Sequence, residues 1–435
     1  MSSSPPPSEP LRAASGTPRA DPRIPRDVWA ISFASLFADW GYEMVLPIFP
    51  FFLIYTLSAN PFIVGLVDGL AQFGQSAMSE VSGALWAQSP QRRRTAAVGY
   101  AITGIGHALM AIATAWPQVL ILRVSAWLGR GTRQPIKQAM VSNASSAAHK
   151  GKSFGIEQTL DSLGAVVGTV VAIAVLLWSG LAFSDSFRLI FALSIIPSAA
   201  AVAAILLFVH DRARRTSPSA SLPGARGPPA PRRVQWFFAA ELVFGLGYFS
   251  ILLALLRVGE SFLPSSGGSV ELAVAASLVI YLLYNVVYTL VPFPAGHWAD
   301  RIPGAGLVAL SFALFVVVDL LLIAGGDVGS GMLAFVIGVL AFTVAGIQIG
   351  VQGVAELAWL SRQVHEGLAG RVFGRLGLIQ GMAILCGSLI AGALWTYVSP
   401  ALAFEVSAVF CSAGAILVAL APRMGSSEPN RAVAA

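Results

Sequence analysis

The stretch from Leu128 to Gly168, LGRGTRQPIKQAMVSNASSAAHKGKSFGIEQTLDSLGAVVG, decides the fold class of this chain. The stretch lies in strongly apolar sequence, yet the helices predicted within it carry Arg130, Arg133, Lys137, Glu157 and Asp161. We interpret it as the end of one transmembrane helix, a short turn at residues 147–152, and the beginning of a second transmembrane helix.

Helical spacing predicts how these charges face one another. Arg130, Arg133 and Lys137 are three and four residues apart, so they share one face of the first helix. The second helix presents a face made of Glu157, Asp161, Gly164 and Gly168. An ionisable group at membrane depth costs ~2.5–3.5 kcal/mol on insertion scales, so such groups usually pair or line a wet pathway. The spacing therefore predicts an acidic pair that meets a basic triplet, beside glycines that let another backbone approach closely.

The composition indicates a polytopic membrane protein. Of the 435 residues, 56% are hydrophobic and only 11% are charged, and the mean hydropathy is +0.74. Soluble domains have about 25% charged residues. The apolar runs suit helices of about 20 residues rather than the alternating strands of about 10 residues found in membrane barrels. Cys386 and Cys411 lie in late apolar segments and predict no disulfide framework.

The sequence also argues against several classes of function. It has no HExxH or CxxC metal spacing and no phosphate-binding GxxxxGK followed by Ser or Thr. We therefore expect no metal site, no cofactor and no ATP-driven pump within this chain. No spacing of a nucleophile and a base indicates an enzyme. The formal net charge is +6, but Lys and Arg cluster in short loops between apolar runs, which indicates membrane orientation rather than nucleic-acid binding.

Hydropathy predicts an all-α membrane protein with twelve transmembrane helices. The predicted spans are 28–56, 62–88, 95–115, 118–146, 154–178, 186–209, 236–258, 270–298, 304–324, 331–360, 372–397 and 401–421. A basic segment rich in Pro, Gly and Ser at residues 210–235 divides them six and six and indicates a flexible cytoplasmic linker. The predicted parts are a disordered cytoplasmic tail at 1–27, six-helix bundles at 28–209 and 236–421, and a cytoplasmic tail at 422–435.

Basic residues occur mainly in alternate loops, which predicts the orientation of the chain. One set of loops contains Arg92, Arg93, Arg94, His149, Lys150, Lys152, the run from Arg212 to Arg233, Arg301, Arg362 and Arg371. The other set contains almost none beyond Arg188 and Arg257. The first set of loops is then cytoplasmic. The protein is predicted to lie in the cell's inner or plasma membrane, with both termini in the cytoplasm.

A weak internal repeat relates the two halves. The segment Gly151–Gly155, GKSFG, recurs 219 residues later as Gly370–Gly374, GRVFG. Each copy falls at the junction between the fourth and fifth span of its half. The same offset places Lys137 on Glu356, Asp161 on Gln380 and Gly168 on Gly387. Agreement in sequence and position together predicts a duplication, and hence two six-helix bundles related by pseudo-symmetry.

Three stretches resemble the major facilitator superfamily, and the likeness extends over roughly residues 28–421. The stretches are Asp39-x3-Glu43-Met44-x2-Pro47-x2-Pro50-x-Phe52-Leu53, Gly129-Arg130-Gly131-x-Arg133-x-Pro135, and Gly151-x2-Phe154-Gly155-x5-Leu160-Asp161-x2-Gly164-Ala165-x2-Gly168. Within the superfamily the chain is similar to a prokaryotic branch often described as drug-resistance or efflux transporters.

The chain departs from the pattern of that branch at three places. Lys137-Gln138 stands where the branch has Arg-Asp. The loop between spans two and three keeps Gly83 and a basic run but lacks the usual Asp, whereas the second-half loop retains its motif residues Gly296, Asp300 and Arg301. Thr169 follows Gly168 where proton-linked exporters of the superfamily have proline.

The buried charges are candidates for coupling and gating. Carboxylates desolvated in a cavity can carry a proton, and the candidates for this role are Asp39, Glu43, Glu157 and Asp161. The alternative for Asp39 and Glu43 is a static ion pair with Arg130 or Arg133 that orients helices. The candidates for gating or for pairing with an anion are Arg123, Arg130, Arg133 and Lys137. Ordinary positive charge at a helix end is the alternative for the basic triplet.

Polar stripes within the spans are candidates for a cavity lining. A polar face on a transmembrane helix must face protein or water. The candidates are Asp68, Gln72, Gln75, Tyr281, Tyr284, Asn285, Gln348, Gln352 and Glu356. For the three spans that hold them, packing between helices is the alternative.

The resemblance implies a secondary active transporter that works by alternating access. On that basis we expect proton-coupled export of an amphiphilic small molecule, with protons, the substrate and the lipid bilayer as partners and a functional monomer. A second hypothesis keeps the fold but assigns metal ions, metal chelates or organic anions as cargo. A third is a non-transporting membrane receptor or scaffold.

Overall fold

The structure is a computed structural model that describes residues 24–87, 89–145, 149–210, 231–302, 305–328, 331–364 and 366–420. Every regular element in these residues is a helix. The predicted tails at 1–27 and 422–435 and the predicted linker at 210–235 lie almost entirely outside the described residues. The division of the chain at that linker stays a prediction.

The first half of the chain forms eight α-helices and two short helices of other types. They are α1 (Arg26–Val45), α2 (Phe49–Phe51), the π-helix η1 (Phe52–Thr56), α3 (Pro61–Leu85), α4 (Arg92–Leu109), the 3-10 helix η2 (Met110–Ile112), α5 (Trp116–Ala144), α6 (Lys150–Trp178), α7 (Phe183–Leu193) and α8 (Ile195–Phe208). Pro47 lies between α1 and α2, where the helix is interrupted. Asn60 caps α3 by accepting a hydrogen bond from the backbone N–H of Ile63 at 3.1 Å.

The second half is also built of helices in its described residues. Its elements are α9 (Arg232–Gly247), α10 (Ile251–Phe262), the 3-10 helix η4 (Leu263–Ser266), α11 (Val270–Leu290), α12 (Pro292–Arg301), α13 (Gly306–Asp327), α14 (Gly331–Gln363), α15 (Glu366–Tyr397) and α16 (Pro400–Leu420). Pro292 is the first residue of α12, directly after the interruption that follows α11. The predicted span 236–258 lies within one helical segment that can cross a membrane, Arg232–Phe262, and three residues, Tyr248–Ser250, separate α9 from α10 inside it.

The prediction of an all-α membrane fold is confirmed. Ten helical segments of the described chain are long and apolar enough to cross a membrane. The other two long helices, α3 and α5, have 25 and 29 residues but carry more polar side chains. With them, the segments correspond to the twelve predicted spans.

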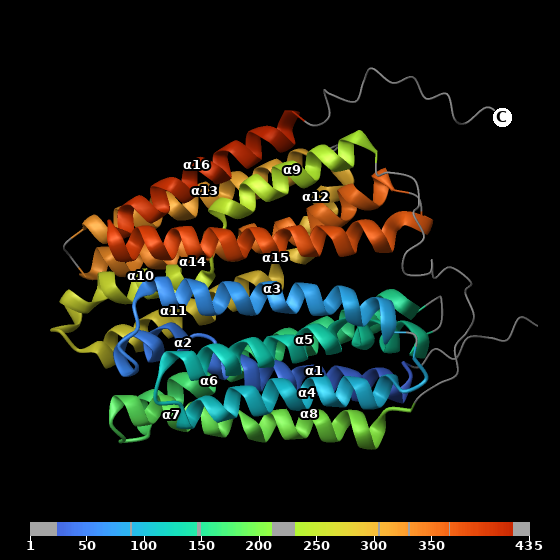
Figure 1. Ribbon diagram of the computed structural model, residues 1–435, viewed down its shortest axis with the longest axis horizontal. Coiled ribbons are helices and arrows are strands. Elements are labelled where there is room, and N and C mark those ends of the chain that lie inside the picture. The colour runs from blue at the N-terminus through green and yellow to red at the C-terminus, as the bar shows by residue number, and fades with distance from the viewer. Residues whose placement is uncertain are drawn as a thin grey trace, which may run out of the picture.

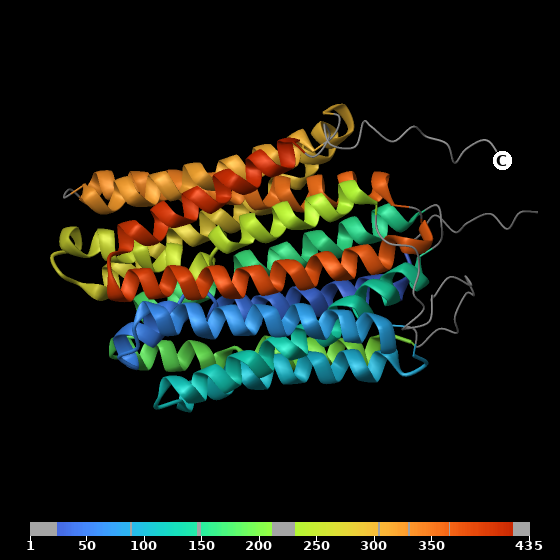
Figure 2. The same cartoon turned by 45° about the horizontal axis from the view of Figure 1, so that its top comes forward.

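The two halves of the chain form two groups of helices that lie side by side (Figures 1 and 2). In both views α3 lies against α15, and α6 also packs on α11. Glycines allow the close approach of α3 and α15. A Cβ atom on Gly69 would lie 3.1 Å from the Cα atom of Leu385, and one on Gly381 would lie 2.6 Å from Ser76 Oγ.

The connections between helices define two ends of the molecule. The basic end holds residues 86–87, 89–91, 145, 149, 302 and 305, which are the described parts of three connections, and the exposed residues Arg94, Lys152, Arg232 and Arg301. The distal end holds the connections at 57–60, 113–115, 179–182, 263–269 and 398–399. By the positive-inside rule, the end that holds more basic residues is predicted to face the cytoplasm.

Candidate functional site

A cavity of about 550 Å³ lies between the two halves of the chain. Gln158 and Ser162 of α6 form one wall. The opposite walls come from the second half and include Glu241, Tyr248, Tyr288, Gln352, Glu356 and Gln380. These residues belong to the parts of their helices nearer the basic end, so the cavity occupies that half of the interface.

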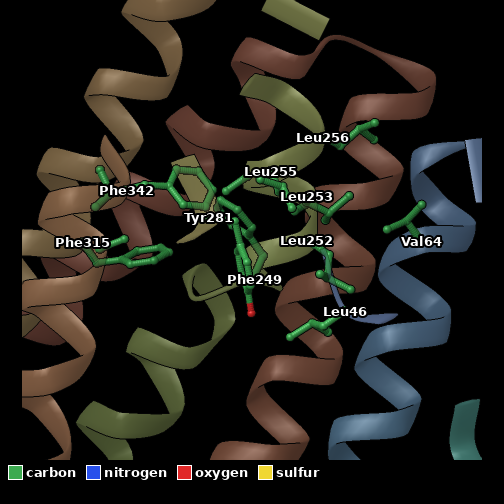
Figure 3. Packing of buried hydrophobic residues seen from close by; sticks show 14 of the residues in the cluster. Leu46, Val64, Phe249, Leu252, Leu253, Leu255, Leu256, Tyr281, Phe315 and Phe342 are labelled. Atoms are coloured by element: carbon green, nitrogen blue, oxygen red, sulfur yellow. The ribbon is translucent and has the colours of Figure 1, made fainter. Parts of the chain in front are cut away.

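Apolar side chains fill the distal half of the interface between the two halves of the chain. Leu46 and Val64 of the first half lie beside Leu252 and Leu253 of α10, and all four are buried (Figure 3). Gly259 of α10 lies against Phe51, because a Cβ atom at Gly259 would be 2.6 Å from the ring of Phe51. We call this packed region the distal seal.

A polar cluster lies directly beside the distal seal and joins the two halves of the chain. Arg123 Nη2 lies 2.9 Å from Asp68 Oδ1, and Gln72 Nε2 donates to Asp68 Oδ2 at 3.0 Å. Ser250 Oγ, from the second half, donates to the same Oδ2 at 2.6 Å. The Ser250 N–H donates to Ser388 Oγ at 3.1 Å. We call these five residues the Asp68 cluster; it ties the interruption before α10 to α3 and α15.

The α5–α6 hairpin contains the meeting of charges that helical spacing predicts. Lys137 Nζ lies 2.5 Å from Glu157 Oε1 and 3.2 Å from Asp161 Oδ1. Ser35 Oγ of α1 donates to the same Glu157 oxygen at 2.9 Å. The Lys137 and Glu157 side chains are almost completely buried. One lysine therefore contacts both acids of α6.

The two arginines of the predicted basic triplet have other neighbours. Arg133 Nη2 lies 3.6 Å from Asp39 Oδ1 of α1, which is the static pairing that the sequence leaves open. The guanidinium of Arg133 also lies over the ring of Tyr100, 4.4 Å from its centroid. The guanidinium of Arg130 lies 4.2 Å from the centroid of the Tyr42 ring, an arrangement in which a cation is attracted by the π face.

Glu43 connects α1 to α11 across the interface of the two halves. Its Oε2 accepts hydrogen bonds from the hydroxyl of Tyr281 at 3.0 Å and from Asn285 Nδ2 at 3.3 Å. Glu43 is buried, and no ion pair within 4.0 Å involves it among the described residues. Neutral donors alone thus hold this carboxyl group in contact with the second half.

A second pair of acids lies in the cavity wall. Gln380 Nε2 donates to Glu241 Oε2 at 3.2 Å and to Glu356 Oε2 at 2.8 Å, so one amide bridges two carboxyl groups. Both glutamates are buried, with exposed fractions of 1% and 5%. In the described part of the chain, the other oxygen of each, Oε1, has no hydrogen-bond partner. No Lys or Arg is among the residues that line the cavity.

The remaining candidates are distributed over the interface. Gln348 Nε2 donates to Gln352 Oε1 at 2.5 Å, and the Tyr284 ring packs between those of Tyr281 and Tyr288. Of the nine cavity candidates, Gln352 and Glu356 line the cavity. Asp68 and Gln72 instead belong to the Asp68 cluster, and Gln75 of α3 has a buried Oε1 without a partner in the described residues.

The loop motif of the second half lies at the basic end. Gly296 lies within α12 with open space around it, and Arg301 is exposed at the last position of that helix. The side chain of Asp300 lies outside the described part of the structure.

Residues of these clusters that were not among the sequence candidates include Glu241, Gln380, Ser250 and Ser388. Glu241, Gln380 and Ser250 all belong to contacts between distant parts of the chain. A signal existed for two of them. Glu241 is an isolated acid in an apolar span, and Gln380 is the repeat equivalent of Asp161. Ser250 carries no signal, because serine is common in transmembrane helices.

Residues 31–283 match the family model described as Major Facilitator Superfamily. Among curated proteins, the chain is similar to an uncharacterised MFS-type transporter of Methanocaldococcus jannaschii. The two are 24% identical over 406 residues, which cover 92% of this chain and 95% of the relative.

Solved structures with the same fold include a nucleoside transporter, NupG, and a peptide transporter, POT. The NupG structure superposes with a TM-score of 0.73 at 14% identity and covers 92% of this chain and 99% of that one. The POT structure superposes with a TM-score of 0.72 at 13% identity and covers 92% and 95%. At these identities the likeness is one of fold.

Proposed function

Because this chain belongs to the Major Facilitator Superfamily, we propose that it is a proton-coupled exporter of an amphiphilic small molecule in the cell's inner or plasma membrane. Its basic end faces the cytoplasm, in keeping with the positive-inside rule. The observation that carries the proposal is the cavity of about 550 Å³ between the two halves, combined with the distal seal. A site between two helix bundles that is closed on one side is what alternating access requires.

The lining of the cavity supports an amphiphilic substrate. Phe244, Tyr248 and Tyr288 supply aromatic faces, and Gln352 and Gln380 supply amide groups. Sites for small organic molecules combine a mainly apolar wall with a few polar groups that fix orientation. The volume of the cavity lies in the range of about 300–1,000 Å³ that is typical of such sites.

We assign proton coupling to Glu43 as the first candidate and to Asp39 as the second. Protonation of Glu43 would weaken the charge-assisted bonds that its carboxylate accepts from Tyr281 and Asn285 of the second half. Protonation of Asp39 would release Arg133. Either event changes contacts of α1. Proton binding would therefore shift the equilibrium between the state in which the cavity is open to one side of the membrane and the state in which it is open to the other.

Transport by purified protein in liposomes tests the proposal. The assay follows chloramphenicol, fluorescein and ethidium, which are neutral, anionic and cationic, under an imposed pH gradient. We expect the gradient to drive accumulation of at least one probe, and E43Q to abolish the dependence on the gradient while leaving exchange of that probe in place. E260Q changes an acid of α10 outside the cavity and serves as the matched control.

Two results would contradict the proposal. Gradient-driven flux that is unchanged in both D39N and E43Q would exclude these two acids as the residues that couple transport to protons. Binding of the probes without any flux in the wild-type protein would favour the non-transporting receptor. The organic-anion alternative requires basic residues at the site, and none is among the residues that line the cavity.

A further inference from the structure

We propose that Glu241 and Glu356 bind the positive charge of an aromatic organic cation in the cavity. This inference rests on the proposed function and specifies its substrate class. The first observation is geometric, because Gln380 Nε2 contacts one oxygen of each carboxyl group, at 3.2 and 2.8 Å. The two acids are therefore held side by side in one wall.

The second observation is that both acids have an unused acceptor. Oε1 of Glu241 and Oε1 of Glu356 are buried without a hydrogen-bond partner in the described structure. No ion pair within 4.0 Å among the described residues involves either glutamate. Buried carboxylates are costly unless they are paired, so this pair requires a positive charge from outside the chain or a proton.

The first half of the chain provides an internal comparison. Lys137 is the repeat equivalent of Glu356, and it forms ion pairs with Glu157 and Asp161 within the protein. In the second half an acid occupies the equivalent position, and the neutralising lysine is absent. The acids of the cavity wall thus have no counterpart of Lys137 among the residues that line the cavity.

The surroundings of the pair match an aromatic cation. Phe244 and Tyr248 follow Glu241 along the chain, and Tyr288 lies on α11; all three line the cavity. A cation within about 6 Å of an aromatic centroid is attracted by the ring face. Aromatic groups on the ligand would pack on the same rings. Both the charge and the apolar surface of the ligand would therefore contribute to its binding affinity.

Binding of tetraphenylphosphonium to the purified full chain tests the inference. Tetraphenylborate has nearly the same shape and the opposite charge, so it is the matched ligand control. We expect saturable binding of tetraphenylphosphonium, no competition by tetraphenylborate, and affinity weakened at least about tenfold in E241Q and in E356Q, as expected when one charge of a buried pair is removed. D319N changes another buried acid, which does not line the cavity, and should keep the wild-type affinity.

A second variant removes no carboxyl group. Q380K would place an ammonium next to both glutamates, as Lys137 is placed in the first half, and should abolish binding of tetraphenylphosphonium. The melting temperature of each variant identifies any that fails to fold. Wild-type affinity for tetraphenylphosphonium in both E241Q and E356Q, binding of tetraphenylborate as tight as that of tetraphenylphosphonium, or no saturable binding of either tetraphenylphosphonium or ethidium would overturn the inference.

The test separates this inference from the proposed function. Loss of the cation site, with proton-driven flux of chloramphenicol retained, would leave a transporter of another substrate class. Saturable cation binding that depends on Glu241 and Glu356, without any gradient-driven flux, would leave the site and remove proton-coupled transport.

Discussion

Glu356 occupies in the second half of the chain the position that Lys137 occupies in the first. Lys137 Nζ lies 3.2 Å from Asp161, and Glu356 accepts a hydrogen bond of 2.8 Å from Gln380, the repeat equivalent of Asp161. Each contact joins the fourth and fifth long helix of its half, but a lysine–aspartate ion pair in the first half stands where the second half has a glutamine–glutamate hydrogen bond. The two halves therefore have the same geometry at this place and different electrostatic roles.

The ion pairs of Lys137 should stabilise the first half. We expect K137M to lower the stability by about 3–5 kcal/mol, because it leaves two buried acids without their partner. The midpoint of unfolding in sodium dodecyl sulfate measures this change. Adding E157Q and D161N should restore much of the loss. K152M, which changes an exposed lysine at the start of α6, is the control. Equal midpoints for K137M and K152M would show that the pairs contribute nothing.

The glycines between α3 and α15 should tolerate no larger side chain. A Cβ atom at Gly381 would lie 2.6 Å from Ser76 Oγ and 2.7 Å from Ser76 Cβ, so G381V must separate the two helices. Gly377 lies one turn earlier on α15 with open space around it. We expect G381V to lower the melting temperature and the transport rate, and G377V to change the melting temperature little. Similar effects of the two variants would refute this account of the interface.

The Asp68 cluster should hold the distal seal closed. S250A removes the hydrogen bond from Ser250 Oγ to Asp68, and about 1 kcal/mol lost from the closed state corresponds to about a fivefold rise in opening. A cysteine at Leu253, in a chain without Cys386 and Cys411, reports opening through its rate of labelling by a water-soluble thiol reagent. D68N should raise this rate further, because it also breaks the pair with Arg123.

The control for that experiment is S311A. Ser311 is buried in α13, and its hydroxyl donates only to the nearby carbonyl of Val308. S311A should leave the labelling rate at Leu253 unchanged. A rate that does not rise in either S250A or D68N would mean that apolar packing alone keeps the seal closed.

The hydrogen bond between Tyr281 and Glu43 should contribute more to the free energy of unfolding than an ordinary hydrogen bond of a hydroxyl group. Its length is 3.0 Å, and the acceptor is a buried carboxyl group. We expect Y281F to destabilise the protein by about 1–3 kcal/mol, the usual cost of leaving a buried acceptor short of donors. In an E43L background the same substitution should have little effect. A double-mutant cycle on unfolding midpoints measures the coupling, and additive effects would exclude it.

Hydropathy was sufficient to place the helices, because the bilayer demands long apolar segments whose ends are polar. The interruption at Tyr248–Ser250 was not predictable in the same way. It contains neither a proline nor a charged residue, and partners on α3 and α15 help to fix it, through Ser250. Tertiary contacts decide the local structure there.

Helical spacing identified which charges share a face but not which partners they meet. It predicted the contact of Lys137 with Glu157 and Asp161, since both helices of that hairpin are adjacent in sequence. It could not predict that Arg130 lies over Tyr42, nor that Glu241 shares an amide with Glu356, because those contacts join remote helices.

The three residues between α9 and α10 divide one membrane crossing into two shorter helices with a joint between them. At the start of α10, Ser250 anchors this helix to α3, and α9 carries Glu241 into the cavity wall. Gly247 borders the joint, where an added Cβ would meet the Ser407 carbonyl and Cys411. The interruption thus separates the part of this crossing that contacts α3 from the part that carries an acid of the cavity wall.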